Sequence, residues 1–257
     1  MIFTVDVGNT NIVLGAFEND KLKFTSRVAT EASKMEDQYA IEFGNIIKLN
    51  GYKPSQFDGA IISTVVPPLM STLKRALKKL LKCRVLVVGP GIKTGLNIKI
   101  DNPAMLGADL VCGAVGALLK YTPPCIIFDM GTATTISGIN AKGEMVGGSI
   151  MPGVRISLEA LSKSAAQLPE INLDMREETV IGANTIDCMA SGVVLGNAAM
   201  MEGMIDRYRE ILGENAVVIA TGGLAPVISK HCRRDVHVEE NLLLDGLYEI
   251  YKKNSAE

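Results

Sequence analysis

Short apolar runs rich in β-branched residues alternate along the chain with longer segments whose apolar residues recur every three or four positions. The short runs predict buried strands, and the longer segments predict amphipathic helices. In the first half the expected elements are strands at about 2–7, 12–17 and 21–29, a helix at 35–50, a strand at 60–66, a helix at 69–82, and strands at 84–88 and 96–100. The order is β-β-β-α-β-α-β, and we expect Pro67-Pro68 to stop the fourth strand.

The second half opens on a predicted helix that begins at Pro103, because proline suits the first position of a helix. It then repeats the three-strand opening of the first half and departs from it afterwards. The expected elements are strands at about 125–129, 133–139 and 144–150, helices at 154–166 and 185–212, a strand at 217–221, a helix beginning beyond Gly223 and a last helix at 240–253. The chain is therefore expected to form two α/β domains, at residues 1–102 and 103–257.

Each half contains an apolar strand that ends in Asp, any residue, Gly and then small polar side chains. The first copy contains Asp6-Val7-Gly8, and the second contains Asp129-Met130-Gly131. Laying one copy over the other places four pairs together: Asp6 with Asp129, Gly8 with Gly131, Val13 with Ile136, and Gly15 with Gly138. One such turn is weak evidence, whereas two that each open a three-strand unit indicate a duplicated domain.

The residues of the first turn suit a bound phosphate. Gly8 lets a ligand approach the backbone closely, and Asn9, Thr10 and Asn11 surround the gap with hydrogen-bond donors. Asp6 lies where a strand would deliver a carboxylate, which favours a divalent ion next to a phosphate held by N–H groups. A single copy of this pattern is equally typical of a polar turn between two strands; the second copy favours the phosphate site.

Two further segments are candidates for chemistry. Asp109 is a carboxylate in largely apolar company near the start of a helix. It could favour the helix dipole, or its surroundings could raise its proton affinity and make it a general base; spacing alone leaves both open. Gly222-Gly223, between a strand and a helix, suits an approach to the phosphates or purine of a nucleotide. The long helix also carries small residues that allow close helix contacts, within the chain or between subunits: Ala190, Gly192, Gly196, Ala198 and Ala199.

Composition and charge exclude several classes of protein. The 257 residues are 47% hydrophobic and 21% charged, and the formal net charge of -2 gives no general basic surface for nucleic acid. No apolar run approaches the length of a membrane span and no signal-type segment opens the chain, so we expect a cytoplasmic protein that binds no membrane. The five cysteines are scattered without a Cys-x-x-Cys pair, so the sequence predicts no zinc site.

Two units with Asp-x-Gly turns resemble the actin-like ATPase superfamily, which includes sugar kinases, actin and acetate kinase. That resemblance implies an α/β fold of duplicated ribonuclease H-like domains, each a mixed sheet with flanking helices, with an ATP cleft between them. A more specific resemblance, along nearly the whole chain, is to the type III pantothenate kinases of bacterial coenzyme A synthesis. It rests on nine segments in order: Asp6–Asn11, Ser63–Pro67, Val88–Gly91, Gly107–Asp109, Asp129–Thr135, Gly147–Gly153, Ala165–Pro169, Asn184-Thr185 and Thr221–Leu224.

This family resemblance implies ATP-dependent phosphorylation of pantothenate and a role for each matching residue. Asp109 would take the proton of the pantothenate hydroxyl, Asp6 would lie near Mg²⁺, directly or through water, and Asp129 would hold a monovalent cation, K⁺ or NH₄⁺. The residues implied in ATP binding are Asp6, Val7, Gly8, Asn9, Thr10, Asn11, Ile12, Val13, Thr132, Gly222 and Gly223. Those implied in pantothenate binding are Gly107, Ala108, Asp109, Leu110, Asn184 and Thr185. The resemblance also implies a homodimer.

The chain departs from the family pattern at two positions. The family usually has Arg directly after the catalytic Asp, where this chain has Leu110, and often has Lys or Arg where this chain has Ala183. An Arg can hold a carboxylate by charge-assisted hydrogen bonds, so its loss would weaken substrate binding unless another cation replaces it. Two alternatives to a pantothenate kinase therefore stay open: a weakly active or non-catalytic regulatory paralogue, and a kinase of another small alcohol.

Overall fold

The computed structural model describes residues 1–172 and 179–255, which form two compact units. The first unit comprises Met1–Leu96, Asp101–Leu119 and Leu242–Glu257; the second comprises Asn97–Ile100 and Lys120–Asn241. This grouping follows contacts, whereas the division expected at residues 102 and 103 follows the duplication in the sequence. The grouping by contacts places the helix after residue 107 and the C-terminal helix in the same unit as the N-terminal sheet.

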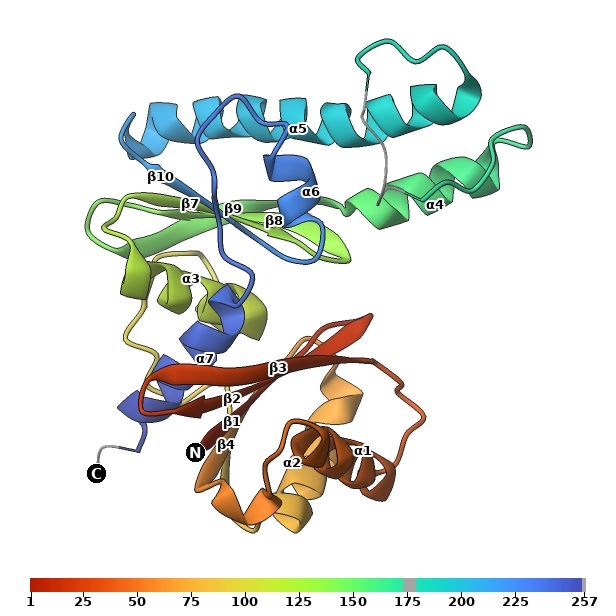
Figure 1. The fold of residues 1–257 in the computed structure, drawn as a ribbon. Helices are drawn as coiled ribbons and strands as arrows, with labels where there is room; N and C mark the ends of the chain where they lie inside the picture. Colours follow the sequence, from red (N-terminus) through yellow and green to blue (C-terminus); the bar gives the residue numbers. More distant parts are fainter. Residues whose placement is uncertain (173–178, 256–257) are drawn as a thin grey trace. The chain divides into compact units, whose positions relative to one another are not determined.

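The first unit is built on a five-stranded mixed sheet in the order β3-β2-β1-β4-β5. Strand β1 pairs antiparallel with β2 on one side and parallel with β4 on the other. The strands are β1 (Ile2–Val7), β2 (Asn11–Glu18), β3 (Lys21–Ala29), β4 (Gly59–Thr64) and β5 (Arg84–Val87). The helices of this unit are α1 (Glu36–Leu49), α2 (Pro67–Leu81), α3 (Ala108–Lys120) and α7 (Leu242–Lys253), with short 3₁₀ turns at Pro54–Gln56 and Pro103–Met105 (Figure 1).

The alternation of side chains along β1 gives this sheet two different faces. Phe3, Val5 and Val7 belong to the core cluster that the residues of α1 and α2 complete. The opposite face, with Thr4 and Asp6, lies under α7, which contacts both β1 and β4 (Figure 1). That helix packs closely, since a Cβ on Gly59 would collide with the Tyr251 side chain.

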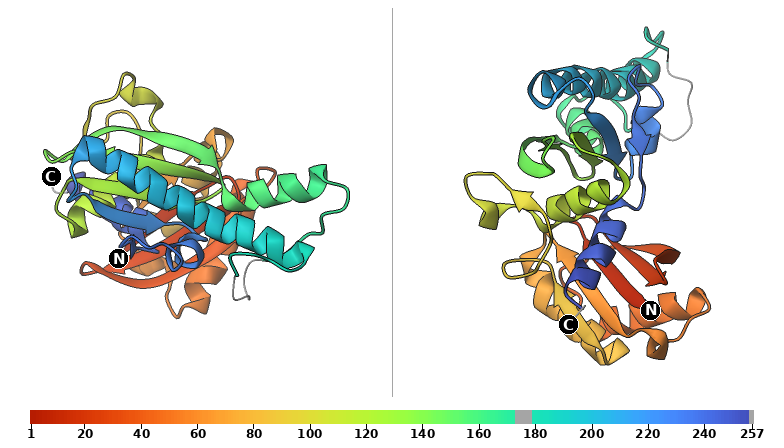
Figure 2. Two further views of the ribbon diagram at one scale, coloured as in Figure 1. Left: turned by 90° about the horizontal axis from the view of Figure 1, so that it is seen from above. Right: turned by 90° about the vertical axis from the view of Figure 1, so that its left-hand side faces the viewer.

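The second unit has a six-stranded sheet in the order β11-β10-β7-β8-β9-β6. Its strands are β6 (Asn97–Ile98), β7 (Cys125–Met130), β8 (Ala133–Ile139), β9 (Glu144–Pro152), β10 (Val217–Thr221) and β11 (His237–Val238). The core lies between this sheet and the helices α4 (Val154–Ser164), α5 (Thr185–Leu212) and α6 (Ala225–Ser229). Helix α5 runs across one face of the sheet (Figure 1 and Figure 2, left).

Helix α5 is the one helix among the described residues that is long and apolar enough to cross a membrane, judged by length and composition alone. In the structure, 44% of the 18-residue segment of this helix that meets the hydropathy criterion is buried. Met201 and Ile205 lie fully in the core of the second unit, and a core helix passes the same test of length and composition. Of the predicted small surface, Ala190 and Ala198 are buried, and Ala198 belongs to this core, whereas Gly192, Gly196 and Ala199 are exposed.

The two units repeat the same strand pattern around their Asp-x-Gly turns. Strand β7 pairs antiparallel with β8 and parallel with β10, as β1 does with β2 and β4. The predicted overlay is wrong beyond the turn, because Val7 pairs with Ile12 but Met130 pairs with Thr134. The second turn is therefore one residue shorter, and Val13 corresponds to Thr135 rather than to Ile136.

Prolines mark two other differences from the prediction. Pro67 and Pro68 do not stop a strand; they occupy the first turn of α2, where the missing N–H would have no intrahelical partner. Pro103 opens only a 3₁₀ turn, because Leu106 is extended, and α3 begins at Ala108. Asp109 consequently lies in the first turn of its helix.

Candidate active site

The first Asp-x-Gly turn is held in shape by its own backbone. The Gly8 N–H donates to the Asn11 carbonyl at 3.0 Å, and the Thr30 hydroxyl donates to the Gly8 carbonyl at 2.7 Å. Asn9, Thr10 and Asn11 are exposed, Asp6 is half-buried at the end of β1, and Ile12 is buried in β2 with Val13 half-buried beside it. Because the Gly8 N–H is used inside the turn, it is not one of the groups that could hold a phosphate.

Asp109 combines a helix start with an apolar setting. Its Oδ1 accepts a hydrogen bond from the Leu110 N–H at 2.8 Å, within the first turn of α3. Burial raises the pKa of this carboxyl above its ordinary value, and the backbone hydrogen bonds oppose that shift without cancelling it. Both interpretations of Asp109 therefore find support: it favours the helix start, and its proton affinity is raised as a base requires.

The Asp109 carboxylate also lies over Gly107. A Cβ on Gly107 would collide with Asp109 Oδ1, the far end of a side chain that can move away. Gly107, Ala108, Asp109 and Leu110 are all half-buried, and the missing side chain at Gly107 leaves room for the carboxylate.

This contact gives a first prediction. Gly107→Ala should displace the Asp109 carboxylate and lower kcat by about tenfold or more, because small misplacements of a catalytic group have large effects on rate. The free energy of unfolding should change little, since only a side-chain end must move. Steady-state kinetics and urea unfolding of the variant test this. The control is Gly113→Ala in α3, where a Cβ meets only a Leu243 methyl at 3.8 Å. Unchanged kcat would show that the carboxylate position is not critical.

The charges of Asp6 and Asp109, which are far apart in sequence, both act on one buried group. The Cys112 thiol is fully buried on α3, and burial, then the charge of Asp6, raises its pKa well above the ordinary value. The charge of Asp109 acts in the same direction. The first unit thus brings the predicted base and the carboxylate of the phosphate turn into one region.

In the second unit, two threonines flank Asp129. It pairs in register with Thr135 on β8 and with Thr221 on β10, so the three side chains share one face of the sheet. Thr221 is buried, and the Thr135 hydroxyl is buried with no hydrogen-bond partner among the described residues. Thr135 and Thr221 are not among the predicted site residues, because their places beside Asp129 follow from the strand register.

Backbone contacts define the second turn. The Gly153 N–H donates to the Thr132 carbonyl at 3.2 Å, and a Cβ on Gly153 would lie 2.6 Å from the Gly131 carbonyl. Gly222 has a φ of +94°, and its Cβ would lie 2.6 Å from the Met130 carbonyl. The predicted segments around Gly153 and Gly222-Gly223 therefore meet at the Asp129 turn, next to the predicted ATP residue Thr132.

The start of α5 carries the last predicted site residues. Asn184 is the N-cap: its side-chain oxygen accepts from the Asp187 N–H at 3.0 Å, and its amide donates to the Asp187 carboxylate at 2.6 Å. Thr185 and Ala183 are exposed beside it. Asn184 thus has a structural task that sequence reasoning did not assign to it.

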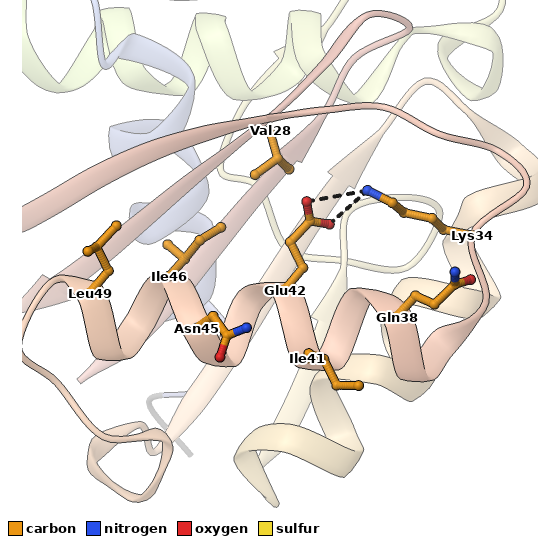
Figure 3. Close-up of a pocket in the computed structure, with 8 residues that line it drawn as sticks. All are labelled: Val28, Lys34, Gln38, Ile41, Glu42, Asn45, Ile46 and Leu49. Carbon is orange, nitrogen blue, oxygen red and sulfur yellow. Dashed lines mark hydrogen bonds and ion pairs between the residues drawn. The ribbon is translucent and has the colours of Figure 1, made fainter.

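A surface pocket in the first unit lies away from these residues. It has a volume of about 650 Å³, and its lining comes from β3, α1 and the segment between them (Figure 3). Lys34 donates to Glu42 across it (Figure 3). None of its lining residues is a predicted site residue: Val28, Lys34, Gln38, Ile41, Glu42, Asn45, Ile46 and Leu49.

The described residues contain no group of three or more His, Cys, Asp or Glu side chains that could hold a metal ion. A metal at Asp6 or Asp129 would therefore need hydroxyl, carbonyl, water or ligand oxygens as well. Magnesium commonly binds in this way, through one or two carboxylates, several waters and substrate phosphates.

Comparison with known proteins identifies the family. Residues 2–207 match the family model of the type III pantothenate kinases. A type III pantothenate kinase of Exiguobacterium sp. strain AT1b is 44% identical over 254 residues, which cover 99% of this chain and 99% of that protein. The chain belongs to the type III pantothenate kinase family. It is therefore a kinase, as the resemblance implied.

Solved structures at lower identity share the fold of this kinase. A Baf-family protein of Campylobacter jejuni, described as a transcriptional activator, superposes with a TM-score of 0.62 at 19% identity, covering 99% of this chain and 100% of that one. The activator of 2-hydroxyisocaproyl-CoA dehydratase from Clostridium difficile, solved with bound ADPNP, gives 0.54 at 13% identity, covering 99% and 96%. These likenesses confirm the predicted actin-like ATPase fold and carry no information on substrate.

Proposed function

We propose that this protein transfers the γ-phosphoryl group of ATP to the primary hydroxyl of pantothenate, giving 4'-phosphopantothenate and ADP in the first step of coenzyme A biosynthesis. Membership of the family supports this reaction. The observation in the structure that supports it is that the base and the carboxylate of the phosphate turn belong to one unit, where the charges of Asp109 and Asp6 both raise the pKa of the same buried thiol.

The chain's own residues supply a base and a binding surface. Asp109 accepts the proton of the pantothenate hydroxyl while that oxygen attacks the γ-phosphorus, and the bond to the ADP oxygen breaks. Burial raises the pKa of Asp109, which makes its carboxylate a better proton acceptor than an exposed one. Phosphoryl transfer otherwise needs positioning and charge stabilisation rather than covalent chemistry by the protein.

A divalent metal ion accompanies ATP in a kinase family, and the residues of the first turn fit Mg²⁺. Asp6 offers a carboxylate at the end of β1, beside a turn whose side chains are exposed to a ligand. When bound, Mg²⁺ neutralises developing charge on the phosphate oxygens. Asp6 would hold it, directly or through water, while the turn from Gly8 to Asn11 positions the phosphates.

A monovalent cation fits the second turn. Asp129 offers a carboxylate, and the buried Thr135 hydroxyl on the same face, which has no hydrogen-bond partner in the described part of the chain, offers a further oxygen. Such an arrangement of oxygen donors suits K⁺ or NH₄⁺, which would screen negative charge near the nucleotide. Replacing potassium with tetramethylammonium should abolish turnover; full activity in that medium would contradict the assignment.

Two segments of the chain are candidates for pantothenate binding. The family pattern implies Gly107–Leu110 in the first unit, beside the base, and Asn184-Thr185 at the start of α5 in the second unit. Gly222-Gly223 and Thr132 would meet ATP instead. These roles rest on the family pattern and on the positions described above.

Leu110 gives a second prediction, because Arg is usual there in the family. Leu110→Arg should lower KM for pantothenate by up to about tenfold, since one recovered charge-assisted hydrogen bond is worth about that much. Half-burial of Leu110 leaves a route to solvent for the longer side chain. Steady-state kinetics measure the change, and Leu110→Met, which adds no charge, is the control. Equal KM values in both variants would make position 110 a packing site.

A coupled ADP-release assay tests the proposed reaction directly. Purified protein with ATP, Mg²⁺ and K⁺ should release ADP only when pantothenate is added. ADP release with another small alcohol, at a kcat/KM above that for pantothenate, would replace the substrate. No release with any acceptor would favour the regulatory paralogue, the alternative that Leu110 in place of Arg keeps open.

We further infer a homodimer in the cytoplasm. Gly192 and Gly196 are exposed on α5, and a Cβ on either glycine would meet no neighbouring atom within 4 Å. Small residues with open space above them let a second helix approach closely. Light scattering that gives the mass of a single chain would contradict the dimer. Recovery of the protein in a membrane fraction would contradict the location.

A further inference from the structure

Arg27 lies in the same row of the first sheet as Asp6, the carboxylate at the end of β1. Asp6 pairs with Val13 on β2, and Val13 pairs with Arg27 on β3. Residues that pair directly across neighbouring strands point to the same face of a sheet, so these three side chains share one face. Since neighbouring strands are about 4.8 Å apart, the Cα atoms of Asp6 and Arg27 are about 10 Å apart.

The end of β3 is attached to the first Asp-x-Gly turn. The Thr30 N–H donates to the Thr10 carbonyl at 2.9 Å, and the Thr30 hydroxyl donates to the Gly8 carbonyl at 2.7 Å. Arg27 precedes Thr30 near the end of β3, the edge strand of the sheet (Figure 1). The backbone that carries Arg27 is therefore held by the phosphate turn itself.

The row of Arg27 lies nearer to the turn than the part of this face that α7 covers. In the adjacent row, farther from the turn, a Cβ on Gly15 would lie 3.0 Å from a Leu244 methyl of α7. In the row of Asp6, by contrast, Asp6 and Val13 are half-buried and Arg27 is exposed. The guanidinium is therefore accessible to a ligand at the turn.

The charge of Arg27 is not used inside the first unit. Its guanidinium forms no hydrogen bond or ion pair within the described part of the chain. Glu31, the nearest acidic residue in the sequence, pairs with Lys34 at 2.8 Å. Basic side chains on an edge strand also prevent pairing with other strands, a task that Lys21 fits, exposed at the start of β3. Arg27 differs from Lys21 in sharing a row with Asp6.

The proposed base belongs to the other side of Asp6. The row continues from Asp6 to Ser63 on β4. Burial raises the pKa of the Cys112 thiol on α3, the charge of Asp6 adds to that shift, and a hydrogen bond from Ser63 opposes it. Cys112 follows Asp109 by about one helical turn. An anion over Asp6 would therefore have the helix of the base on its β4 side and Arg27 on its β3 side.

We propose that Arg27 binds the γ-phosphate of ATP at the first turn and stabilises the charge of the transferred phosphoryl group. The inference rests on the proposed reaction. As the pantothenate oxygen bonds to the γ-phosphorus and the bond to the ADP oxygen breaks, negative charge spreads over the three equatorial oxygens. A guanidinium donates two parallel hydrogen bonds to such oxygens and stays protonated throughout. The hydroxyl proton goes to Asp109.

Nucleotides that differ by the γ-phosphate test this contact without turnover. In Arg27→Met, calorimetry should show about ten- to a hundredfold weaker binding of the β,γ-imido analogue of ATP, the effect of lost charge-assisted hydrogen bonds, and unchanged binding of ADP. In the coupled ADP-release assay kcat should fall by about a hundredfold or more, because charge that develops in the transition state loses a donor. Arg27→Lys keeps the charge without the fork, so both effects should be smaller.

Lys21→Met is the matched control, because it removes one positive charge from the other end of the same strand. It should leave nucleotide binding and kcat unchanged. Arg27 is exposed, so Arg27→Met should melt within a few degrees of the parent. If that variant does not fold, Arg27→Lys decides instead, by weaker binding of the ATP analogue with unchanged binding of ADP.

The outcomes separate this inference from the proposed reaction. If Arg27→Met weakens both nucleotides equally, or neither, the inference is wrong, and the reaction stands as long as the parent releases ADP with pantothenate. A higher KM for pantothenate with unchanged nucleotide binding would place Arg27 at the pantothenate carboxylate and also overturn the inference. A parent that releases no ADP, but needs Arg27 to distinguish the ATP analogue from ADP, would retain the contact and remove the proposed reaction.

Discussion

Asp109→Asn is expected to lower kcat by about two to four orders of magnitude, the usual contribution of a general base. The replacement keeps the size of the side chain and removes its ability to take the hydroxyl proton. ATP affinity should be unchanged, because the phosphate turn lies on another element. The coupled ADP-release assay measures kcat, and calorimetry measures ATP binding.

The stability of this variant follows from the sign of the pKa shift. Burial raises the pKa of Asp109, so the folded state binds a proton there more readily than the unfolded state does. The charged carboxylate therefore costs stability at pH 7, above the ordinary pKa, and that cost disappears as the pH falls below both values. Asn carries no charge, so Asp109→Asn should unfold at an equal or higher urea concentration than the parent.

The pH profile distinguishes a base from a structural acid. In the parent, kcat/KM for pantothenate should rise with pH through an apparent pKa above the ordinary Asp value of 3.8. This limb should be absent from the residual activity of Asp109→Asn. A variant with near-parent kcat, or an unchanged pH limb, would remove Asp109 from the base role.

The strands and both Asp-x-Gly turns could be predicted because their signals are local. The apolar run before Asp6 and the one before Asp129 each specify a buried strand, and the glycine two residues later specifies a tight turn. The fold followed from two copies of this pattern, and the family from nine matching segments in order; the comparisons confirm both. The individual site roles stay predictions.

Other features depended on contacts between distant segments. The pairing of Asp6 with Ser63, and of Asp129 with Thr135 and Thr221, depends on the register between strands, which the local sequence does not specify. The one-residue difference between the two turns was hidden for the same reason. The start of α3 was misplaced because the extended Leu106 separates the 3₁₀ turn at Pro103 from the helix.

The two turn glycines provide the second large effect, because the structure treats them differently. A Cβ on Gly8 would lie 3.2 Å from the Asn11 carbonyl, which is tight against backbone that carries the turn's own hydrogen bond. A Cβ on Gly131 would lie 3.6 Å from the Ala133 carbonyl, an ordinary contact, and Gly131 is exposed. Contacts within the protein therefore account for glycine at position 8. They do not account for glycine at position 131, where the space suits a ligand.

Gly8→Val and Gly131→Val should both reduce ATP affinity by about a hundredfold or more, through the loss of charge-assisted hydrogen bonds to phosphate when a branched side chain fills the turn. Their stabilities should differ. Gly8→Val should lower the free energy of unfolding by about 1–3 kcal/mol, the usual effect of overpacking, whereas Gly131→Val should change it by less than about 0.5 kcal/mol. Calorimetry with ATP and urea unfolding measure the two quantities. Unchanged ATP affinity in a stable Gly131→Val variant would mean that phosphate does not approach the second turn, because a Cβ at position 131 makes only ordinary contacts.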